Sequence, residues 1–543
     1  KREAWMNVAL VCFAFIVMVL TTLFITRAIS DLVLRPLQRM LVSVKRIAQP
    51  ILGDVSGLGL ADERLDDEVF VLESIVHKLG KIAGIASELS VGRFPASMEN
   101  LEDEDKGVLQ MMFQQNRKKS GCATQPAGAS HGSRSSHGPG DEAPPPGEEM
   151  RSQLETLRLS FEELCSWDFN VLSLERTRQT GVAGWLLLQS TAALGQVQLS
   201  PEVTLKFLQT MAQHYLAENP YHNWMHAVDV MHTLWLMLRI ARAHSFLGGI
   251  DHFALLVSAI SHDVGHLGVT NQFLVETGHE LAMRYNDCSP LENMHCAKTF
   301  GIASGTPGAN IFEHLGRADF FESRRVCIEA ILHTDMVHHF DMVKEMQVLY
   351  QMNSEALEKD PATLFREKTT KQKVVNLFLH AADVSNPCKP WAICQEWASR
   401  VLEEFFAQGD KEKQLEIPVQ MLNDRCKVNR PFSQIGFIEF MIVPLEAAKV
   451  KLFPLLFELT EFLQSNIQEW RRLWVEELNP SDEERDKVEA RIQRASGVLS
   501  QARESANTHF WSRAESAEDL GHERPSVKIK SSSRQSTESC GER

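Results

Sequence analysis

Apolar residues recur at helical spacing through most of the region 151–502. Segments such as Val203 to Ala217, Met231 to Ala243, Thr370 to Ala382 and Trp391 to Gln408 place apolar side chains three and four positions apart. Proline and glycine separate these segments, as is typical of helix ends. The alternation of apolar and polar residues that indicates strands is scarce, and no repeat of solenoid period is present. The region is therefore predicted to form an all-α, multi-helix domain.

The charge balance limits the partners of this chain. Its 543 residues include 56 Lys plus Arg and 71 Asp plus Glu, which gives a formal net charge of −15. Nucleic-acid binding depends on a basic face that releases counterions from phosphate, so we expect no nucleic-acid partner. The ten cysteines are too sparse and irregular for a disulfide scaffold or a zinc knuckle, which favours reduced thiols in a cytosolic domain.

An uncharged apolar run near the start of the sequence extends from Ala4 to Ile25. A helix of about 22 residues is roughly 33 Å long, enough to cross the hydrocarbon core of a bilayer. We predict a single transmembrane helix over 4–26, with a buried core helix as the weaker alternative. Basic residues cluster on the C-terminal side of the run, at Arg27 and onwards, so the bulk of the protein is expected to be cytoplasmic.

Two heptad stripes follow the apolar run. They comprise Leu34, Leu37, Leu41, Val44 and Ala48, and then Leu72, Ile75, Leu79, Ile82, Ala86 and Leu89. Such stripes bury their apolar faces against a partner helix, which predicts a parallel coiled coil in a homodimer. With a proline near the start, a glycine-bearing connector and an acidic opening to the second helix, the segment 27–89 resembles a HAMP signalling module. A plain dimerising stalk is the alternative.

Two further segments have the composition of flexible chain. The segment 90–150 contains a stretch dense in Gly, Ser, Pro and charge, and it is predicted to be a linker. The segment 503–543 is polar and rich in serine, and a disordered tail is expected there.

Histidine and aspartate gather in a few short motifs of the helical region. His222 and His226 in YHNWMHAVDV are four residues apart, and on one helix they would share a face, as two ligands or as one ligand and one acid. SHDVGHLG supplies His262 and Asp263. Asp383 ends the apolar run of VVNLFLHAAD, where a carboxylate is costly unless it is paired or binds a metal. A single histidine of this kind is more often structural, but two His with two Asp form a nitrogen and oxygen set suited to Zn²⁺.

Additional polar groups favour a second ion. Glu292 and His295 in LENMH, with Thr334 and Asp335 in HTDM, are groups that hold Mg²⁺ through water, and Mn²⁺ is a substitute. Two ions about 3.5–4 Å apart generate a bridging hydroxide at neutral pH and neutralise the charge that develops on a phosphate. The sequence thus predicts a two-metal site for a phosphate ester.

The order of the motifs adds a family resemblance. The series YHNWMHAVDV, SHDVGHLGVTNQF, YNDCSPLENMH, HTDM, HAADVSNPCKPW, EEFFAQGDKEK and SQIGFIEF resembles the catalytic domain of the class I 3′,5′-cyclic-nucleotide phosphodiesterases over about 300 residues. The resemblance implies that His226, His262, Asp263 and Asp383 bind zinc, with Asp263 bridging to magnesium. It also implies that His222 is the general acid that protonates the departing 3′ oxygen.

The same resemblance implies roles for other residues. It implies that the waters of the second metal are ordered by His266, Glu292, Thr334 and Asp335. We add His295 to this group because it lies in the same motif, LENMH, as Glu292. It implies a substrate pocket formed by Tyr221, Asn386, Val401, Gln434 and Phe437, in which the glutamine bonds the purine and Val401 and Phe437 clamp it. Taken alone, the two apolar residues would be assigned to the core and the glutamine to the surface.

One motif departs from the family. An acidic residue usually lies two positions after the metal-binding aspartate, whereas this chain has Gly265, and it has Leu267 where a proline is common. Our main hypothesis is a membrane-tethered phosphodiesterase. A glutamine amide can turn to meet adenine or guanine, so the motif by itself does not choose between cAMP and cGMP, and cAMP is the favoured expectation. The alternative is a catalytically weak or inactive receptor that binds cyclic nucleotide. A hydrolase of another phosphate ester is disfavoured by the SQIGF motif.

Overall fold

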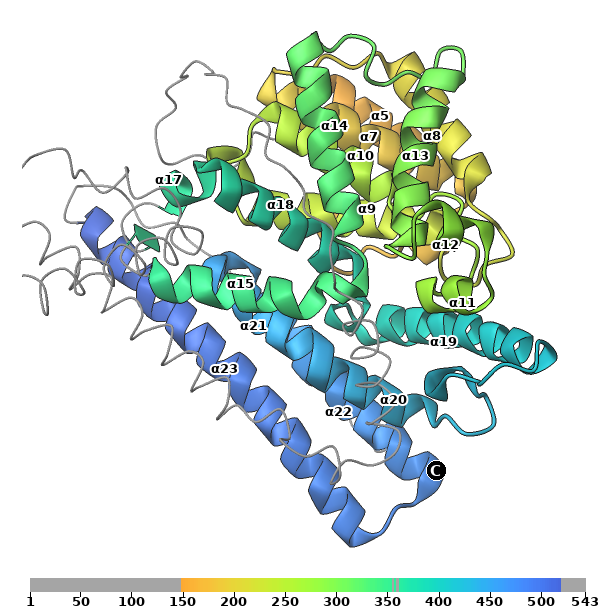
Figure 1. The fold of residues 1–543 in the computed structure, drawn as a ribbon. Coiled ribbons are helices and arrows are strands. Elements are labelled where there is room, and N and C mark those ends of the chain that lie inside the picture. Colours follow the sequence, from red (N-terminus) through yellow and green to blue (C-terminus); the bar gives the residue numbers. More distant parts are fainter. Residues whose placement is uncertain (1–147, 354–355, 358–360, 519–543) are drawn as a thin grey trace, which may run out of the picture. The chain divides into compact units, whose positions relative to one another are not determined.

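The computed structural model describes residues 148–353, 356–357 and 361–518, and this part of the chain is helical without strands (Figure 1). The all-α prediction is therefore confirmed for these residues. The predicted membrane helix at 4–26, the HAMP-like segment at 27–89 and nearly all of the linker lie outside them. Among the helices that are described, none combines the length and the apolar character needed to span a bilayer.

The helices follow one another with short connections. The first group is α5 (Glu148–Thr156), α6 (Phe161–Leu164), η4 (Val171–Ser173), α7 (Arg176–Leu194), α8 (Pro201–His214), α9 (Trp224–Ile240), η5 (Ala243–Ser245) and α10 (Gly249–Ser261). The middle group is α11 (Asn271–Glu276), α12 (Glu280–Arg284), α13 (Pro290–Gly305), α14 (Arg317–Leu332), η6 (Met336–His338), α15 (His339–Met352), α17 (Pro361–Arg366), α18 (Lys368–Asp383) and η7 (Asn386–Cys388). The last group is α19 (Trp391–Gln414), η8 (Met421–Asn423), α20 (Arg430–Phe437), η9 (Ile438–Ile442), α21 (Val443–Leu452), η10 (Pro454–Leu456), α22 (Glu458–Leu478) and α23 (Asp482–Glu518).

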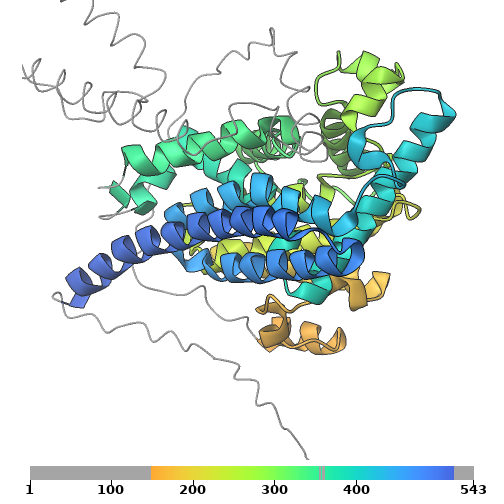
Figure 2. The same ribbon diagram turned by 90° about the horizontal axis from the view of Figure 1, so that it is seen from below.

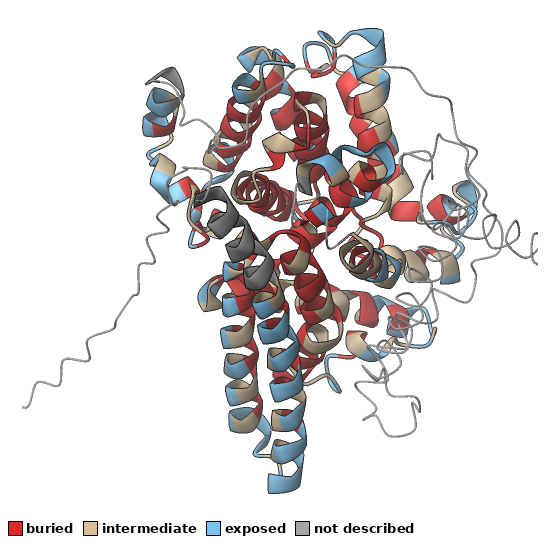
Figure 3. Cartoon of the chain, turned by 90° about the vertical axis from the view of Figure 1, so that its left-hand side faces the viewer, coloured by how far each residue is buried: buried red, intermediate tan, exposed pale blue. Residues whose placement is uncertain are grey.

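Helices α9 and α10 form the centre of the core. Both are buried on nearly every side, because apolar residues surround their axes. In Figure 3 the buried residues, in red, gather in the interior of the helical region. Helix α9 packs against α7, α10 and α18, and α10 also packs against α14. The side chains at the ends of α9, α10 and α18 are therefore held by a rigid, tightly packed interior.

The C-terminal helices form a second layer of packing. Helix α21 packs against α23 and α20 packs against α22, and α21, α22 and α23 run side by side in Figure 2. Between α20 and α21 the chain forms a π-helix, η9, a distortion that is often found at functional sites. Arg491 on α23 binds Glu439 of this π-helix with an Nε–Oε2 distance of 2.7 Å.

The four segments with helical spacing all coincide with helices, namely α8, α9, α18 and α19. Helix α23 continues through Glu518, past the predicted domain boundary at 502. Leu499 and Ala502 are buried, so tertiary packing holds this helix up to that boundary. A helix that is already nucleated extends cheaply into the following residues. The disordered tail stays a prediction for 519–543, which lie outside the described residues.

Candidate active site

Three helix ends deliver the four predicted metal ligands. His226 lies in the first turn of α9, where the side chain of Asn223 caps the helix by accepting hydrogen bonds from the backbone N–H groups of Met225 and His226. His262 is the C-cap of α10, and Asp263 follows it. Asp383 is the last residue of α18, ahead of the Ser-Asn-Pro stop.

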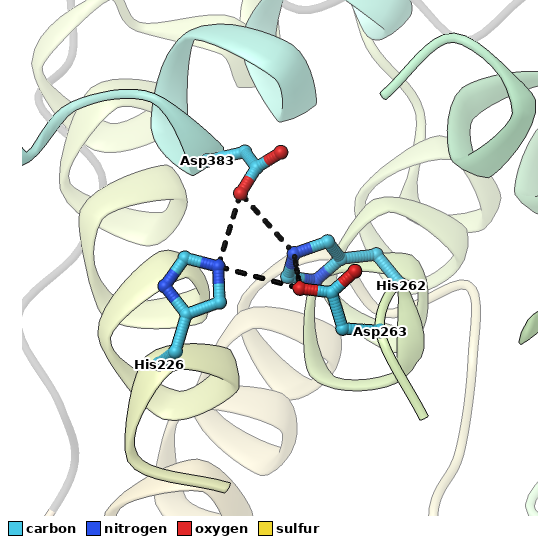
Figure 4. Close-up of side chains that lie close together, drawn as sticks. All are labelled: His226, His262, Asp263 and Asp383. Carbon is cyan, nitrogen blue, oxygen red and sulfur yellow. Dashed lines mark hydrogen bonds and ion pairs between the residues drawn. The ribbon is translucent and has the colours of Figure 1, made fainter. Parts of the chain in front are cut away.

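These four side chains converge on one point, as Figure 4 shows, and their ligand atoms all lie within 4.8 Å of one another. His226 Nε2 is 3.0 Å from Asp383 Oδ1 and 3.5 Å from Asp263 Oδ2. His262 Nε2 is 3.1 Å from Asp263 Oδ2 and 3.3 Å from Asp383 Oδ1. Residues up to 157 positions apart in sequence thus form a single cluster.

The electrostatics of the cluster call for a cation. Burial raises the pKa of Asp263 and Asp383, but the neighbouring imidazoles, that of His262 above all, outweigh it and hold both pKa values below the ordinary range. Histidines are the only cationic side chains that pair with these two carboxylates in the described part of the chain. A buried and a half-buried carboxylate that have no Lys or Arg partner would be stabilised by a metal ion.

The hydrogen bonds of His262 also fit a metal ligand. Its Nδ1–H donates to the carbonyl oxygen of Ala259 at 2.9 Å, which leaves Nε2 directed at the cluster, where a bound cation would take the place of the Nε2 proton. Nε2 is buried and makes no well-formed hydrogen bond, although two carboxylate oxygens lie within 3.3 Å of it. Atoms that aim at a common centre rather than at each other are expected of a Zn²⁺ site.

A second group of oxygen atoms, which includes two residues predicted to order the waters of magnesium, lies together around Asn271. The amide of Asn271 donates to Glu292 Oε2 at 2.8 Å and to Asp335 Oδ2 at 3.3 Å, and Ser289 Oγ donates to Asp335 Oδ2 at 2.7 Å. Burial and the nearby Asp335 raise the pKa of Glu292 well above its ordinary value. A hydrated divalent cation would relieve this repulsion between carboxylates.

His295 lies between the two groups. Its Nδ1–H donates to the carbonyl oxygen of Val264 at 3.0 Å, and its Nε2 lies 3.7 Å from Asp263 Oδ1. Burial lowers the pKa of His295 to about 4, so the ring is neutral and can accept a hydrogen bond from water. Thr334, the residue before Asp335, is buried, and its hydroxyl donates to the carbonyl oxygen of Ile331 at 2.8 Å.

The position of His222 differs from the prediction. It precedes the N-cap Asn223, so it lies in the turn before α9 and not on the same helix as His226. The turn nevertheless holds it at the site, where its ring stacks on His266 with centroids 3.8 Å apart. The asparagine that follows His222 is a typical N-cap residue. Reading it as a cap would have predicted a helix that begins after this histidine.

Glu404 on α19 holds His222 in place. Its Oε1 accepts a hydrogen bond from Nδ1–H of His222, and its Oε2 accepts from the backbone N–H groups of Tyr221 at 3.0 Å and His222 at 3.1 Å. Burial opposes a charged His222, but Glu404 and then Asp263 outweigh it and raise the pKa of His222 to about 9. His222 is therefore a protonated imidazolium with Nε2–H as its remaining donor.

Sequence reasoning missed Glu404 and Asn271. Glu404 belongs to the motif EEFFAQGDKEK, and it shares a helical stripe with Trp397, Val401 and Gln408, at spacings of four, three and four. The available signal for a buried, partnered glutamate was its place on the same helical stripe as the apolar residues Trp397 and Val401. Asn271 had no such signal, since its role depends on carboxylates that come from α13 and η6.

The predicted substrate residues fall into two places. Asn386 Nδ2 donates to the hydroxyl of Tyr221 at 2.5 Å, and Val401 packs in the same small cluster as Tyr221. Gln434 is buried on α20, and Phe437, the last residue of that helix, packs against the main core. The two apolar residues of the predicted clamp therefore belong to different hydrophobic clusters, and the clamp remains a prediction.

Gly265 has a structural reason in this chain. Its φ of +75° is a left-handed conformation that glycine adopts readily. A Cβ atom built there would lie 2.0 Å from Lys298 Nζ, so the ammonium group occupies the space of the missing side chain. The departure from the family motif thus leaves the four ligands assembled.

Comparison with known proteins gives two family matches. The model described as 3′5′-cyclic nucleotide phosphodiesterase matches residues 221–463, which include every predicted site residue. A model described as RasGEFs all helical domain matches residues 1–86. The second match overlaps the predicted membrane helix and HAMP-like segment, which remain predictions.

Curated relatives match the same region. The mouse protein named high affinity cAMP-specific and IBMX-insensitive 3′,5′-cyclic phosphodiesterase 8A is 34% identical over 329 residues, which are 58% of this chain and 40% of the relative. The Drosophila melanogaster protein named dual specificity calcium/calmodulin-dependent 3′,5′-cyclic nucleotide phosphodiesterase 1 is 36% identical over 288 residues, 52% of this chain and 33% of the relative. This chain thus spans well under two thirds of the length of either protein.

A solved structure agrees with the phosphodiesterase family match and with the curated relatives. The crystal structure of the phosphodiesterase domain of the rhodopsin phosphodiesterase from Salpingoeca rosetta has a TM-score of 0.53 and 32% sequence identity. The match covers 59% of this chain and 94% of that domain.

Proposed function

This chain belongs to the 3′5′-cyclic nucleotide phosphodiesterase family, and we propose that it hydrolyses a 3′,5′-cyclic nucleotide to the 5′-monophosphate. The observation that carries the proposal is the convergence of His226, His262, Asp263 and Asp383. The adjacent pair of His222 and Glu404 adds a group that can donate a proton. Together they provide the parts needed to cleave a cyclic phosphodiester.

Two divalent cations are the cofactors we propose for this site. The four converging ligands would hold Zn²⁺, and Asp263 also faces the groups that would order the waters of Mg²⁺ or Mn²⁺. When bound, the ions supply positive charge for the phosphate and lower the pKa of the attacking water. The chain itself contributes the fixed positions of the ligands at three helix ends.

His222 is the proposed general acid. A water molecule loses one proton to solvent and attacks phosphorus as hydroxide, the bond from phosphorus to O3′ breaks, and the proton on Nε2 of His222 moves to O3′ as the 3′ hydroxyl leaves. Glu404 keeps this imidazole protonated and fixes the orientation of the ring, because it accepts a hydrogen bond from Nδ1, the opposite ring nitrogen. The side chain of His222 is 23% exposed, so it can reach a bound substrate.

The base is proposed to lie between Val401 and Phe437, with Gln434 bonding its polar edge. An aromatic and an aliphatic face around an amide suit a flat heterocycle. We favour cAMP as the substrate because the mouse relative is named as cAMP-specific, whereas the Drosophila relative is named as dual specificity.

The cellular setting is also a proposal. The apolar run at 4–26 supports a single-pass membrane protein with a cytoplasmic catalytic domain, and the heptad stripes of 27–89 support a homodimer. In this arrangement the coiled coil relays a signal from the membrane to the catalytic domain.

The decisive experiment measures product formation by the purified full-length chain. We expect hydrolysis of cAMP to 5′-AMP in the presence of Mg²⁺, slower hydrolysis of cGMP, and loss of both on chelation of metal. His222→Ala serves as the inactive control. Tight nucleotide binding without product from the unmodified chain would instead support the receptor that Gly265 suggested.

A further inference from the structure

A cavity of about 770 Å³ lies on the side of α13 that faces α8 and α12. Its lining includes His214, His279, Arg284, Tyr285 and Lys298. None of these residues belongs to the catalytic groups described above. A volume of this size is typical of a pocket for a small organic molecule.

The lining is rich in hydrogen-bond donors. Lys298 is about half buried and has no hydrogen bond or ion pair with the protein in the described part of the chain. Arg284 lies 3.9 Å from Glu280, the acidic side chain of the lining, and both are well exposed. The cavity therefore presents positive charge in a protein whose net charge is −15.

The two histidines have defined hydrogen-bond directions. Nδ1 of His279 accepts from the backbone N–H of Leu281 at 3.2 Å, so the proton of this ring lies on Nε2, where it can be donated. Nδ1–H of His214 donates to the carbonyl oxygen of Thr210 at 2.8 Å, which leaves its Nε2 for a ligand. One ring thus offers a donor and the other an acceptor, a pair that suits an anion that also carries a hydroxyl group.

The floor of the cavity is open because α13 carries small residues there. Ala297, Gly301 and Gly305 recur every four residues and line the same side of the helix. A Cβ atom built on Gly301 or Gly305 meets no atom within 4 Å. Met294 and Ile302 supply apolar surface beside them.

We propose that this cavity binds a small soluble phosphate monoester. Lys298, Arg284 and the Nε2–H of His279 would receive the phosphate oxygens, and the apolar floor and Tyr285 would contact the organic part. The head group of Lys298 also lies against Gly265, in the turn between Asp263 and His266. The inference stands on the cavity itself and does not depend on the reaction proposed above.

Calorimetric titration of the full-length, metal-loaded protein with glycerol 3-phosphate tests the proposal, and glycerol is the neutral control. Lys298→Gln removes the buried charge, and Gly301→Leu fills the cavity. We expect each to weaken binding at least tenfold. The matched controls are Lys206→Gln, an exposed lysine on α8, and Gly497→Leu, an exposed glycine of α23 with open space around it, and neither should change the affinity.

Folding and binding are separable in this design. Leucine has a higher helix propensity than glycine, so Gly301→Leu should melt at or above the temperature of the unmodified protein while losing the ligand. Equal affinity in the unmodified protein and both cavity variants would overturn the proposal, because glycerol 3-phosphate would then bind elsewhere, the metal site included. Absence of binding at millimolar concentration, or binding only to vesicles that contain phosphatidic acid, would also overturn it.

Discussion

Substitution of Glu404 by glutamine tests how the protein keeps its proposed general acid protonated. The carboxylate of Glu404 is 4% exposed and, after burial, is the strongest influence on His222, whose pKa it raises to about 9 from an ordinary value of 6.5. Glutamine keeps the shape and an acceptor for Nδ1–H but removes the negative charge. The pKa of His222 in Glu404→Gln should therefore fall to near or below 6.5.

The expected loss of activity follows from the protonated fraction of His222. At pH 8 a group with a pKa of about 9 is ~90% protonated, whereas a group with a pKa of 6.5 is ~3% protonated. The rate constant kcat/KM at pH 8 should fall about 30-fold, and much less at pH 6. Because a general acid is lost as pH rises through its pKa, the basic limb of the pH profile should move to lower pH.

Initial-rate measurements of cyclic-nucleotide hydrolysis between pH 5.5 and 10 provide the assay. Glu403→Gln is the matched control, since Glu403 is the preceding residue on α19 but is 42% exposed and pairs with Arg425 and Arg430. Its profile should keep the basic limb of the unmodified protein. A Glu404→Gln profile that loses activity equally at every pH would refute the electrostatic reasoning and leave only a structural role for the carboxylate.

Three other substitutions address the metal ligands, the acid and the core. Asp383→Asn should lower the zinc content measured by mass spectrometry together with the activity, whereas full zinc occupancy would contradict its place as a ligand. His222→Ala should reduce kcat by about 10²–10⁴-fold with metal content retained, and metal loss would show that it binds the ion. Asp229→Asn leaves the ammonium of the buried Lys389, 2.5 Å away, without a carboxylate partner. It should lower the free energy of unfolding by about 3–5 kcal/mol in urea titrations. An unchanged denaturation midpoint would contradict that last expectation.

Local pattern predicted the helices but not all of their ends. The spacing of apolar residues located α8, α9, α18 and α19. Each of these helices buries an apolar stripe, and the helical period of such a stripe can be seen in the local sequence. The predicted helix shared by His222 and His226 was wrong, since the capping by Asn223 depends on one hydrogen-bonding side chain and not on periodicity. Helix α23 extends past the predicted boundary at 502, because packing at Leu499 and Ala502 supports a helix whose later residues are polar.

The candidate site was predictable where a costly residue marked it. Asp383 followed an apolar run, which signalled a buried carboxylate that needs a partner. Asn271 carries no comparable mark, since it becomes functional only when the fold brings Glu292 and Asp335 to either side of it. The cavity beside α13 was also invisible, because alanine and glycine in a helix indicate space only when the neighbouring helices are known.

The use of helix ends explains how a packed helical domain can hold cations. His262 and Asp263 follow the C-terminus of α10, and Asp383 ends α18, so two helix C-termini lie at the cluster of four side chains. The partial negative charge at each C-terminus adds to the carboxylates and favours a cation there. The helix bodies meanwhile are mostly apolar and tightly packed, which fixes the positions of the side chains at their ends. Moving any of these ligands one turn inward would keep its chemistry but bury it against apolar neighbours, away from the other ligands.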